Sequence, residues 1–290
     1  MATALAVDIG GTKLAAGLVS SEGTLLRRHQ VPTEGRDGEA LFAALTALVA
    51  QVREGDEVVC GVGVGGPMAP AGEEVSPLNI PAWRAFPLRR RLAEATGLAT
   101  FVDNDAKALA LGEGWVGAAA GQNDFLAMVV STGVGGGLVL DGRLVEGASG
   151  NAGHVGHVIV RPDGHRCGCG ARGCLEAEAS GTGIRRATGR PPEEATPEVV
   201  HHAGTMLGRA VASVASLCDL GLALVAGSVA LGFGEPFFAA AQAELDRRAC
   251  LDFSAGARVR PAGLGDRGPL VGAGAVGWRG LGRPVLGPGR

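Results

Sequence analysis

The sequence predicts an α/β fold built from two lobes, and three observations lead to this prediction. Apolar segments of strand character alternate with segments of helical character along the 290 residues, which is typical of sheets covered by helices. Residues 4–19 and 125–140 resemble each other, because each is an apolar strand, a glycine-rich turn and a second apolar strand. The chain is also long enough for two lobes of the usual domain size. The repeated hairpin indicates a duplicated architecture, with one hairpin per lobe facing a common cleft.

Further helices and strands are expected around the two hairpins. Helices are predicted at residues 41–52, 88–96, 106–115 and 205–217, and strands at residues 58–64, 100–102 and 222–226. Gly97 follows the second of these helices, as is typical of a helix end. Residues 191–197 are expected to form a loop with helix-start signals, and the tail after Gly280, rich in Gly, Pro and Arg, is expected to fray.

The composition excludes several classes of protein. The longest apolar stretch, residues 211–234, contains Asp219 and several Gly and Ser residues, which favours a buried helix and strand over a membrane span. The net charge is −3 and no basic stripe appears, so no nucleic-acid partner is expected. The 50 glycines have no three-residue period, which excludes collagen. No export signal is apparent, so a cytoplasmic location with reduced or metal-bound cysteines is expected.

The turn of the first hairpin has the composition of a phosphate-binding site. It contains Gly10, Gly11, Thr12 and Lys13, directly after Asp8 and Ile9. Glycines let the backbone approach a phosphate, and successive N–H groups can form a concavity that binds anions. The hydroxyl of Thr12 can donate to a phosphate, and Asp8 can hold Mg²⁺ through water. For this motif alone, an ordinary hairpin turn is the alternative.

The second hairpin repeats the pattern and strengthens the phosphate-binding interpretation. Its turn contains Thr132, Gly133 and Gly135. Neither turn matches the Walker pattern GxxxxGK[ST], so a P-loop enzyme is not expected. Gly227 ends a strand and precedes a predicted helix, a position suited to nucleotide contact.

Residues 61–66 read GVGVGG and match the dinucleotide-binding pattern GxGxxG. That pattern requires a following helix, whereas Pro67-Met68-Ala69-Pro70 comes next. We therefore interpret Gly66 as part of a tight connection between a strand and a loop, close to a bound substrate.

Three polar residues, Asp103, Asn104 and Asp105, lie between a short strand and a predicted helix. Ligands of open α/β sheets bind beyond the carboxyl ends of strands. A carboxylate there can accept a proton from an attacking hydroxyl, and an asparagine can both donate to and accept from a sugar. The alternative is that Asp103 or Asp105 only caps the helix.

A group of four residues has the spacing of a metal site. His157, Cys167, Cys169 and Cys174 follow the pattern H-x9-C-x-C-x4-C, which fits a closed tetrahedral Cys₃His zinc site of structural type. The alternative is a set of reduced, buried thiols. The other three cysteines, Cys60, Cys218 and Cys250, lie in apolar sequence and are expected to be core residues.

Other polar residues near these motifs are candidates for sugar contacts. His154 and Glu176 flank the predicted zinc loop, although either could be a surface group. Asn79 and Trp83 lie in a loop bounded by prolines, which suits a carbohydrate site as well as a packed turn. The remaining histidines beyond residue 160, His165, His201 and His202, are expected to be solvated.

Taken together, these residues resemble the ROK family of sugar kinases and sugar-responsive repressors. The matching stretches are AVDIGGTKLAAGLV, NIPAW, FVDNDAKALALGE, VVSTGVGGGLVLDG, GHVGH, CGCGARGCLEAEASG, VAGSVA and GPLVGAGAVG. The resemblance implies an actin-like (ribonuclease H-like) ATPase fold with ATP in the cleft between two lobes. The lobes expected are residues 1–107, joined by residues 271–290, and residues 108–270, which include a zinc loop at residues 157–176.

The resemblance also implies roles for individual residues. Asp105 corresponds to the catalytic base. The sugar-binding positions expected are Gly66, Asn79, Asn104, Asp105, His154, His157 and Glu176. The nucleotide-binding positions expected are Asp8, Gly10, Gly11, Thr12, Lys13, Thr132, Gly133, Gly135 and Gly227. The zinc ligands expected are His157, Cys167, Cys169 and Cys174.

The activity implied is ATP-dependent transfer of a phosphoryl group to the 6-hydroxyl of a hexose or amino-hexose, with Mg²⁺ and a structural zinc ion. Most glucose-type members carry Glu where this chain has His154. The GHVGH stretch resembles bacterial N-acetylmannosamine kinases, whereas NIPAW resembles glucokinases. The sugar is therefore left open among glucose, N-acetylmannosamine and an amino sugar such as kanosamine, and homodimers or homotetramers are expected.

Two other classes of function compete with a kinase. A sugar-responsive repressor would need a DNA-binding module before the first hairpin, which begins within the first ten residues. A non-catalytic sensor of sugar and nucleotide would not need Asp105, whose presence argues against it.

Overall fold

The computed structural model describes residues 2–33 and 37–287 and confirms the α/β class. Contacts divide the chain into two compact units, each containing most or all of a five-stranded sheet. The first unit comprises Met1–Gln122, Leu144–Ala152 and Gly263–Arg290, and the second comprises Asn123–Arg143 and Gly153–Ala262. The lobe boundaries expected after residues 107 and 270 differ from this division, because each falls inside a helix of the first unit.

The first unit contains a sheet with the strand order β3-β2-β1-β4-β5. Its strands are β1 (Thr3–Ile9), β2 (Lys13–Ser20), β3 (Leu25–Pro32), β4 (Glu57–Val64) and β5 (Thr100–Asn104). β1, β4 and β5 run parallel, and β2 pairs antiparallel with both β1 and β3. The carboxyl ends of three neighbouring parallel strands therefore meet at one end of the sheet.

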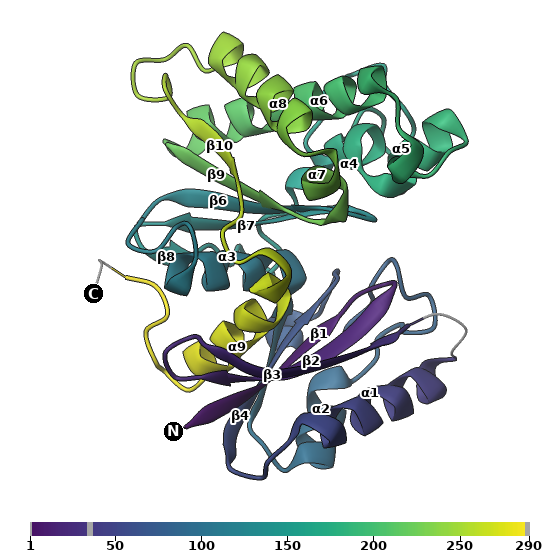
Figure 1. Ribbon diagram of the computed structural model, residues 1–290, viewed down its shortest axis with the longest axis vertical. Coiled ribbons are helices and arrows are strands. Elements are labelled where there is room, and N and C mark those ends of the chain that lie inside the picture. The colour runs from purple at the N-terminus through teal and green to yellow at the C-terminus, as the bar shows by residue number, and fades with distance from the viewer. Residues whose placement is uncertain (1, 34–36, 288–290) are drawn as a thin grey trace. The chain divides into compact units, whose positions relative to one another are not determined.

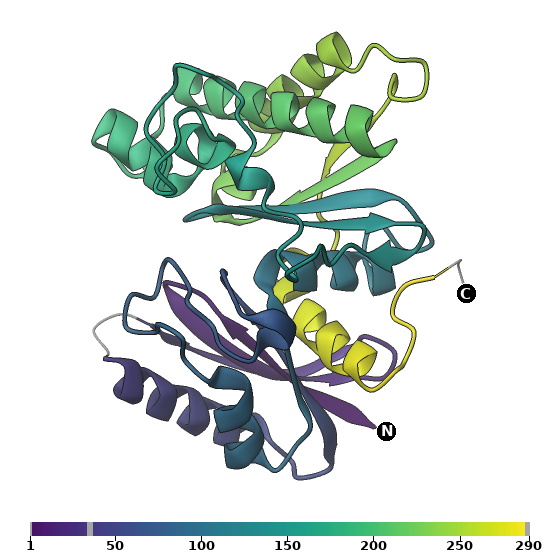
Figure 2. The same ribbon diagram turned by 180° about the vertical axis from the view of Figure 1, so that it is seen from behind.

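Helices cover both faces of this sheet (Figures 1 and 2). They are α1 (Gly38–Val52), α2 (Leu88–Thr96), α3 (Asp105–Val116) and α9 (Gly268–Gly280). Leu5 and Val7 of β1 point to the face covered by α1 and α2, whereas Ala6 packs with α9 on the other face. Because side chains alternate along a strand, Asp8 lies on the face of Ala6, with α9 and α3.

Close approach of α9 to the sheet requires glycine in β4. A β-carbon on Gly61 would lie 2.0 Å from the carbonyl oxygen of Ala273 in α9. Glycine at this position lets the helix backbone lie directly on the strand. The face of the sheet that carries Asp8 is therefore held at a fixed distance from α9.

The second unit has a sheet with the strand order β10-β9-β6-β7-β8. Its strands are β6 (Phe125–Val130), β7 (Val134–Leu140), β8 (Arg143–Leu144), β9 (Leu222–Ala226) and β10 (Arg258–Pro261). Its helices are α4 (Leu175–Ala179), α5 (Gly181–Thr188), α6 (Pro197–Cys218), α7 (Ser228–Phe233) and α8 (Glu235–Arg248). Short 3₁₀ turns occur in both units. η1 (Pro70–Gly72) and η4 (Gly265–Arg267) belong to the first unit, and η2 (Val155–His157) and η3 (Pro192–Glu194) to the second. One apolar core joins the sheet to α6 and α8.

Both predicted hairpins are confirmed, as β1–β2 and β6–β7. Three predicted helices correspond to α1, α2 and α3, but α6 begins at Pro197 instead of residue 205. Thr196 is its N-cap and Pro197 occupies the first turn, a usual start for a helix. Its buried residues begin only at Ala203. The helical spacing of apolar residues in the sequence therefore starts later than the helix, which is why its first turns were not predicted. In the described part of the chain, no helix is long and apolar enough to cross a membrane.

Part of the C-terminal tail makes contacts with the first unit. Val285 is buried, and the guanidinium of Arg283 lies 4.6 Å from the centre of the Trp278 ring. An aromatic ring attracts a cation above its face, so this contact holds the tail against α9. Residues 288–290 lie outside the described residues.

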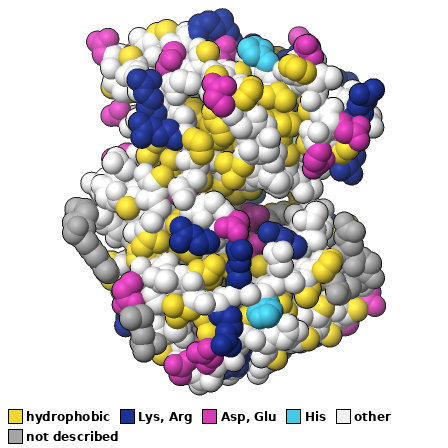
Figure 3. All heavy atoms as spheres, in the orientation of Figure 1, with side chains coloured by type: hydrophobic (Ala, Val, Ile, Leu, Met, Phe, Trp, Pro, Cys, Tyr) yellow, Lys and Arg dark blue, Asp and Glu magenta, His cyan; other side chains and the backbone are white. Residues whose placement is uncertain are grey.

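Charges are interspersed on the face of the molecule drawn in Figure 3, where Lys and Arg side chains lie among Asp and Glu. This distribution agrees with the net charge of −3.

Candidate active site

The first hairpin tip is held by a residue that the sequence did not single out. The Gly10 amide donates to the Lys13 carbonyl at 3.0 Å and closes the turn. The hydroxyl of Thr33 donates to the Gly10 carbonyl at 2.8 Å, and the amide of Thr33 donates to the Thr12 carbonyl at 3.0 Å. Thr33 therefore fixes the backbone of the turn, while the side chains of Thr12 and Lys13 are exposed.

The two candidate carboxylates, Asp8 and Asp105, come together across β4. Asp8 pairs in register with Gly63, and Gly63 pairs with Asp103. A β-carbon on Gly63 would stand 3.6 Å from the Cα of Asp105 and 3.8 Å from Oδ1 of Asp8. Both carboxylates thus lie at the carboxyl ends of parallel strands, where open α/β sheets bind ligands.

The proximity of these two carboxylates changes the acidity of Asp8. Burial, with a contribution from the negative charge of Asp105, raises the pKa of Asp8 to about 7, although the Lys13 ammonium acts in the opposite direction. A divalent cation beside Asp8 would favour the ionised form. The environment of Asp8 therefore suits a group that becomes fully ionised when Mg²⁺ arrives.

We expect Asp8→Asn to change how stability depends on pH. The folded protein keeps the Asp8 proton between about pH 4 and pH 7, where the unfolded chain loses it, so the free energy of unfolding falls as the pH rises through this window. A difference of about 3 pKa units corresponds to about 4 kcal/mol. Urea unfolding at pH 4.5 and pH 8 without Mg²⁺ should show that the variant loses less stability between the two pH values than the parent.

Asp56→Asn is the matched control for this prediction, because Asp56 is exposed in the same unit. It should leave the difference between the two pH values as it is in the parent. If Asp8→Asn shifted the unfolding midpoint equally at both pH values, the proposed protonation of Asp8 would be wrong.

Helix α3 begins at the candidate base, and its cap is Asn104. The side-chain oxygen of Asn104 accepts from the Ala106 amide at 3.0 Å. Asp105 is the first residue of the helix, and its Oδ1 also accepts from that amide, at 2.9 Å. Asp103 instead contacts the ammonium of Lys107, one turn along the helix, at 3.1 Å. The residue that caps the helix is thus Asn104, which the capping alternative did not name, and Asp105 shares the Ala106 amide with it.

Asn79 lies between the first hairpin and the end of β4. A β-carbon on Gly11 would be 2.9 Å from the Cβ of Asn79, and one on Gly65 would be 3.3 Å from its Oδ1. The loop that carries Asn79 is hydrogen-bonded to Gly66, another predicted sugar-binding position. The Leu78 amide donates to the Gly66 carbonyl at 3.2 Å. Asn79 and Gly66 thus belong to the same end of the sheet as Asp8.

Arg84, which the sequence did not single out, holds the Asn79 loop. Its Nη1 donates to the carbonyls of Pro77 and Ile80, each at 3.0 Å, and to that of Trp83 at 2.5 Å. Trp83 is fully buried, and its indole donates to the Gly38 carbonyl at 3.0 Å. The aromatic of this loop is therefore a packing residue, as in the packed-turn alternative, while Asn79 lies beside the glycine turns.

In the second unit, the second hairpin contacts the helix that follows the cysteine loop. The Val134 amide donates to Oε2 of Glu176 at 3.0 Å. A β-carbon on Gly133 would lie 2.8 Å from the same oxygen, so glycine allows this carboxylate to reach the turn. Gly135 follows in β7, paired with Val129. The predicted positions Gly133 and Glu176 are thus brought together.

The same hairpin turn contacts two helix starts. The Thr182 amide donates to the Thr132 carbonyl at 3.2 Å at the start of α5. Ser228 follows Gly227 and begins α7. Its hydroxyl lies 2.9 Å from that of Ser131 in the turn. Gly227 has φ = 103°, a conformation that favours glycine. The predicted nucleotide-contact residues Thr132 and Gly227 therefore lie around one turn of the second unit.

The four predicted zinc ligands form a compact cluster. One ligand atom from each of His157, Cys167, Cys169 and Cys174 lies within 4.8 Å of the others. Sγ of Cys167 is 3.7 Å from Nδ1 of His157, and the Sγ atoms of Cys169 and Cys174 are 3.7 Å apart. Tetrahedral zinc with bonds of about 2.3 Å to sulfur separates its ligands by about 3.8 Å. The cluster therefore fits a zinc ion.

His154 and Glu176 lie at opposite ends of the cysteine loop. The ring of His154 is 6.2 Å from that of His157, at an interplanar angle of 19°. Cys174 is the N-cap of α4, which carries Glu176 in its first turn. A metal ion bound by the cluster would therefore restrain the positions of both His154 and Glu176.

One expectation about other side chains was wrong, and it concerns a cysteine. His165 and His201 are exposed as expected, and the ring nitrogens of His165 and His202 also lie 3.1 and 3.0 Å from the buried carboxylate of Glu178. Cys250 is exposed, whereas Cys60 is buried as expected. Burial raises the pKa of the Cys60 thiol to about 12, which makes it an inert core residue.

The chain matches the model of the ROK family over residues 4–277. It is a member of the ROK family. Among relatives, it is 41% identical over 187 residues to a glucokinase of Thermotoga maritima, covering 63% of this chain and 58% of that protein. It is 37% identical over 249 residues to an N-acetylmannosamine kinase of Escherichia fergusonii, covering 80% of this chain and 85% of that protein.

A solved ROK structure confirms the predicted actin-like fold class. The ROK family glucokinase of Streptomyces griseus, in complex with glucose and AMPPNP, is 32% identical and matches with a TM-score of 0.84. The match covers 96% of this chain and 99% of that one. The fold of this ROK protein is therefore that of sugar kinases.

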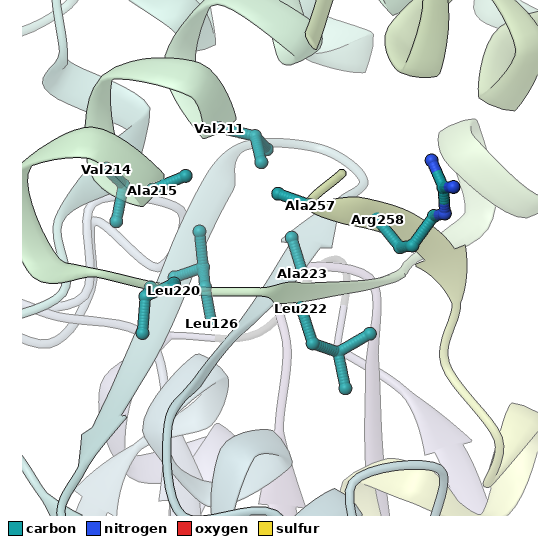
Figure 4. Close-up of a pocket in the computed structure, with 9 residues that line it drawn as sticks. All are labelled: Leu126, Val211, Val214, Ala215, Leu220, Leu222, Ala223, Ala257 and Arg258. Carbon is teal, nitrogen blue, oxygen red and sulfur yellow. The ribbon is translucent and has the colours of Figure 1, made fainter. Parts of the chain in front are cut away.

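A region of the second unit drawn in Figure 4 has a different character from these sites. Side chains of α6, β6 and β9 meet there and leave no room for a water molecule. Its lining is almost wholly aliphatic, and the charged end of Arg258 points away from the other side chains. The region offers no carboxylate or side-chain amide to a sugar or phosphate, so we regard it as part of the packed core.

Proposed function

We propose that this ROK protein is an ATP-dependent sugar kinase that phosphorylates the 6-hydroxyl of a hexose or amino-hexose. The observation that carries the proposal is the pair of carboxylates Asp8 and Asp105, at the carboxyl ends of parallel strands and beside a glycine hairpin. The similarity to a glucokinase and an N-acetylmannosamine kinase supports the same conclusion.

In the proposed mechanism, Asp105 orients the sugar 6-hydroxyl and accepts its proton. The hydroxyl oxygen forms a bond to the γ-phosphorus of ATP as the bond between that phosphorus and the bridging oxygen breaks, and ADP leaves with the electron pair. The position of Asp105 suits this role, because it is the first residue of α3 and directly follows β5, at the end of the sheet where open α/β sheets bind ligands.

The two glycine turns are proposed to hold the triphosphate. Backbone N–H groups of these turns would donate to phosphate oxygens and offset charge on the transferring group, except those of Gly10 and Val134, which already donate within the protein. Asp8 would hold Mg²⁺ through water. When bound, Mg²⁺ supplies charge neutralisation on the phosphate oxygens.

Several residues are proposed as sugar contacts. They are Gly66, Asn79, Asn104, His154, His157 and Glu176. The four residues of the cysteine cluster would hold zinc, which orders the loop and takes no part in phosphoryl transfer.

A coupled assay of ADP release tests the proposal directly. Glucose, N-acetylmannosamine, mannose, glucosamine and kanosamine should be supplied with ATP and Mg²⁺, and NMR of the product should place the phosphate on C6. We expect at least one sugar to give sugar-dependent ADP release. If sugars bind but none of them causes ADP release, the result would instead support a non-catalytic sensor.

The ROK protein is also proposed to act as a homodimer or homotetramer. Light scattering coupled to size-exclusion chromatography would measure its mass in solution. A mass equal to that of one chain across the concentration range of the assay would contradict this proposal.

A further inference from the structure

Lys107 is a buried cation in the first turns of α3, close in sequence to the proposed base. Its side chain is only 2% exposed. The ammonium contacts Oδ1 of Asp103 at 3.1 Å and donates to the Gly150 carbonyl at 3.2 Å and to the carboxylate of Glu146. An isolated buried ammonium is strongly unfavourable, whereas three oxygen partners satisfy all of its donors.

The partners of Lys107 lie on a segment with little regular structure. Residues 144–152 group by contacts with the first unit, although the chain on either side of them belongs to the second. Beyond Leu144 at the end of β8, the segment contains no helix or strand. Its order must therefore come from side-chain and turn contacts.

Other contacts hold this segment together with those of Lys107. The Arg279 guanidinium donates to Oε1 of Glu146 at 2.7 Å, and the Ala152 amide donates to the Glu146 carbonyl at 3.0 Å. The side-chain amide of Asn151 reaches the Met68 carbonyl at 3.4 Å. Glu146 is thus the residue on which the cationic contacts of the segment converge.

The electrostatics agree with a tight local network. Burial raises the pKa of Asp103, and the charge of Lys107 opposes that shift. Burial acts in the same direction on Glu146, but hydrogen bonds from Lys107 and Arg279 outweigh it and hold the pKa of Glu146 below its ordinary value. Two carboxylates and two cations therefore balance one another at this point.

The segment leads directly to a candidate sugar contact. Ala152 ends it, and His154 follows two residues later. At the other end of the network, Lys107 is two residues from Asp105. A single buried ammonium thus connects the helix of the proposed base with the chain that leads to His154.

We propose that Lys107 is a positioning residue, which fixes residues 144–152 against the start of α3 and thereby sets the position of His154 relative to the sugar. It does so through Glu146 and Gly150 and touches neither sugar nor nucleotide. The proposal rests on the proposed sugar kinase activity only for its kinetic part, because the order of the segment can be measured without catalysis.

Hydrogen exchange of the whole protein tests the structural part. In Lys107→Met, which keeps the length of the side chain and removes the charge, exchange in residues 144–152 should speed up about tenfold or more, because breaking a buried ion pair leaves its partner uncompensated. Exchange in β6 and β9 should remain as in the parent. Unchanged exchange in the segment, or an equal increase throughout both units, would overturn the proposal.

A double-mutant cycle tests whether the effect passes through Glu146. Glu146→Gln removes the charge and keeps an oxygen acceptor, so it should give a smaller increase in exchange than Lys107→Met. The variant with both changes should exchange no faster than Lys107→Met alone, since the two residues act on one contact. Additive effects would overturn the assignment to this pair.

If Lys107→Met does not fold, Glu146→Gln alone provides the test. It must still speed up exchange in the segment by more than about twofold. No increase in exchange would overturn the proposal.

Kinetics test the link to the sugar site. We expect KM for the sugar to rise about tenfold in Lys107→Met, with KM for ATP and the zinc content within about twofold of the parent. Arg90→Met is the control, because Arg90 forms an exposed pair with Glu94 on α2 and exposed pairs contribute little. Faster exchange with an unchanged KM for the sugar would overturn the role in sugar positioning. A parent protein without activity would refute the kinase proposal and leave the exchange result as the separate test of the contact.

Discussion

Asp105→Asn is expected to lower kcat by roughly 10²–10⁴-fold, the usual loss for removal of a general base. The amide cannot accept the proton of the sugar hydroxyl at neutral pH. Binding of the sugar and of ATP should change much less, because the amide keeps the size and most hydrogen-bonding positions of the carboxylate. Steady-state assays with the best sugar of the panel, together with calorimetric binding, would separate the two effects.

The fold should survive this substitution, since α3 has a separate cap. Asn104 accepts from the Ala106 amide, so the helix start does not depend on Asp105 alone. Thermal unfolding of the variant should lie close to that of the parent, and Asp56→Asn should leave kcat unchanged. A kcat within about threefold of the parent in Asp105→Asn would refute its role as base.

Cys169→Ser should remove the metal and destabilise the second unit. Metal analysis should find about one zinc ion per chain in the parent and little in the variant, because a serine hydroxyl is a poor zinc ligand at neutral pH. Loss of about 3 kcal/mol of metal-linked stability corresponds to a fall of roughly 5–10 °C in the unfolding temperature. Calorimetry and elemental analysis of the same preparations provide both measurements.

This substitution should also lower kcat/KM, since the cluster holds the start of α4. Cys174 caps that helix, and Glu176 in its first turn accepts from the Val134 amide. Cys250→Ser is the matched control, because Cys250 is exposed and lies outside the cluster; zinc content and activity should both persist. Full activity in metal-free Cys169→Ser would contradict the structural role of the metal.

Local patterns in the sequence were sufficient for several elements. The alternation of apolar residues and the glycine turns predicted β1–β2 and β6–β7, because hairpin partners are neighbours along the chain. β3 was missed, since most of its residues are exposed and its sequence LLRRHQVP has a run of four polar residues, so it lacks the alternation of a half-buried strand. The contact of the tail with the ring of Trp278 was not predicted, because it depends on packing against α9.

Among the site residues, those close together in sequence were the most predictable. The four cluster residues span His157 to Cys174, and their spacing alone limited how they could meet. Arg84 and Thr33 gave no comparable signal, because an arginine or a threonine in a loop has many roles. Their importance comes from the carbonyl groups that they contact.

The sequence by itself determined the α/β class, the two glycine hairpins and the composition of the metal cluster, because all of these depend on residues near one another in the chain. Only the tertiary structure decided that Asp8 lies beside Asp105 across Gly63 and that Lys107 holds the segment of Glu146. The order of parallel strands and the path of a loop are set by packing between distant segments. Such packing leaves no periodic signal in the residues that it brings together.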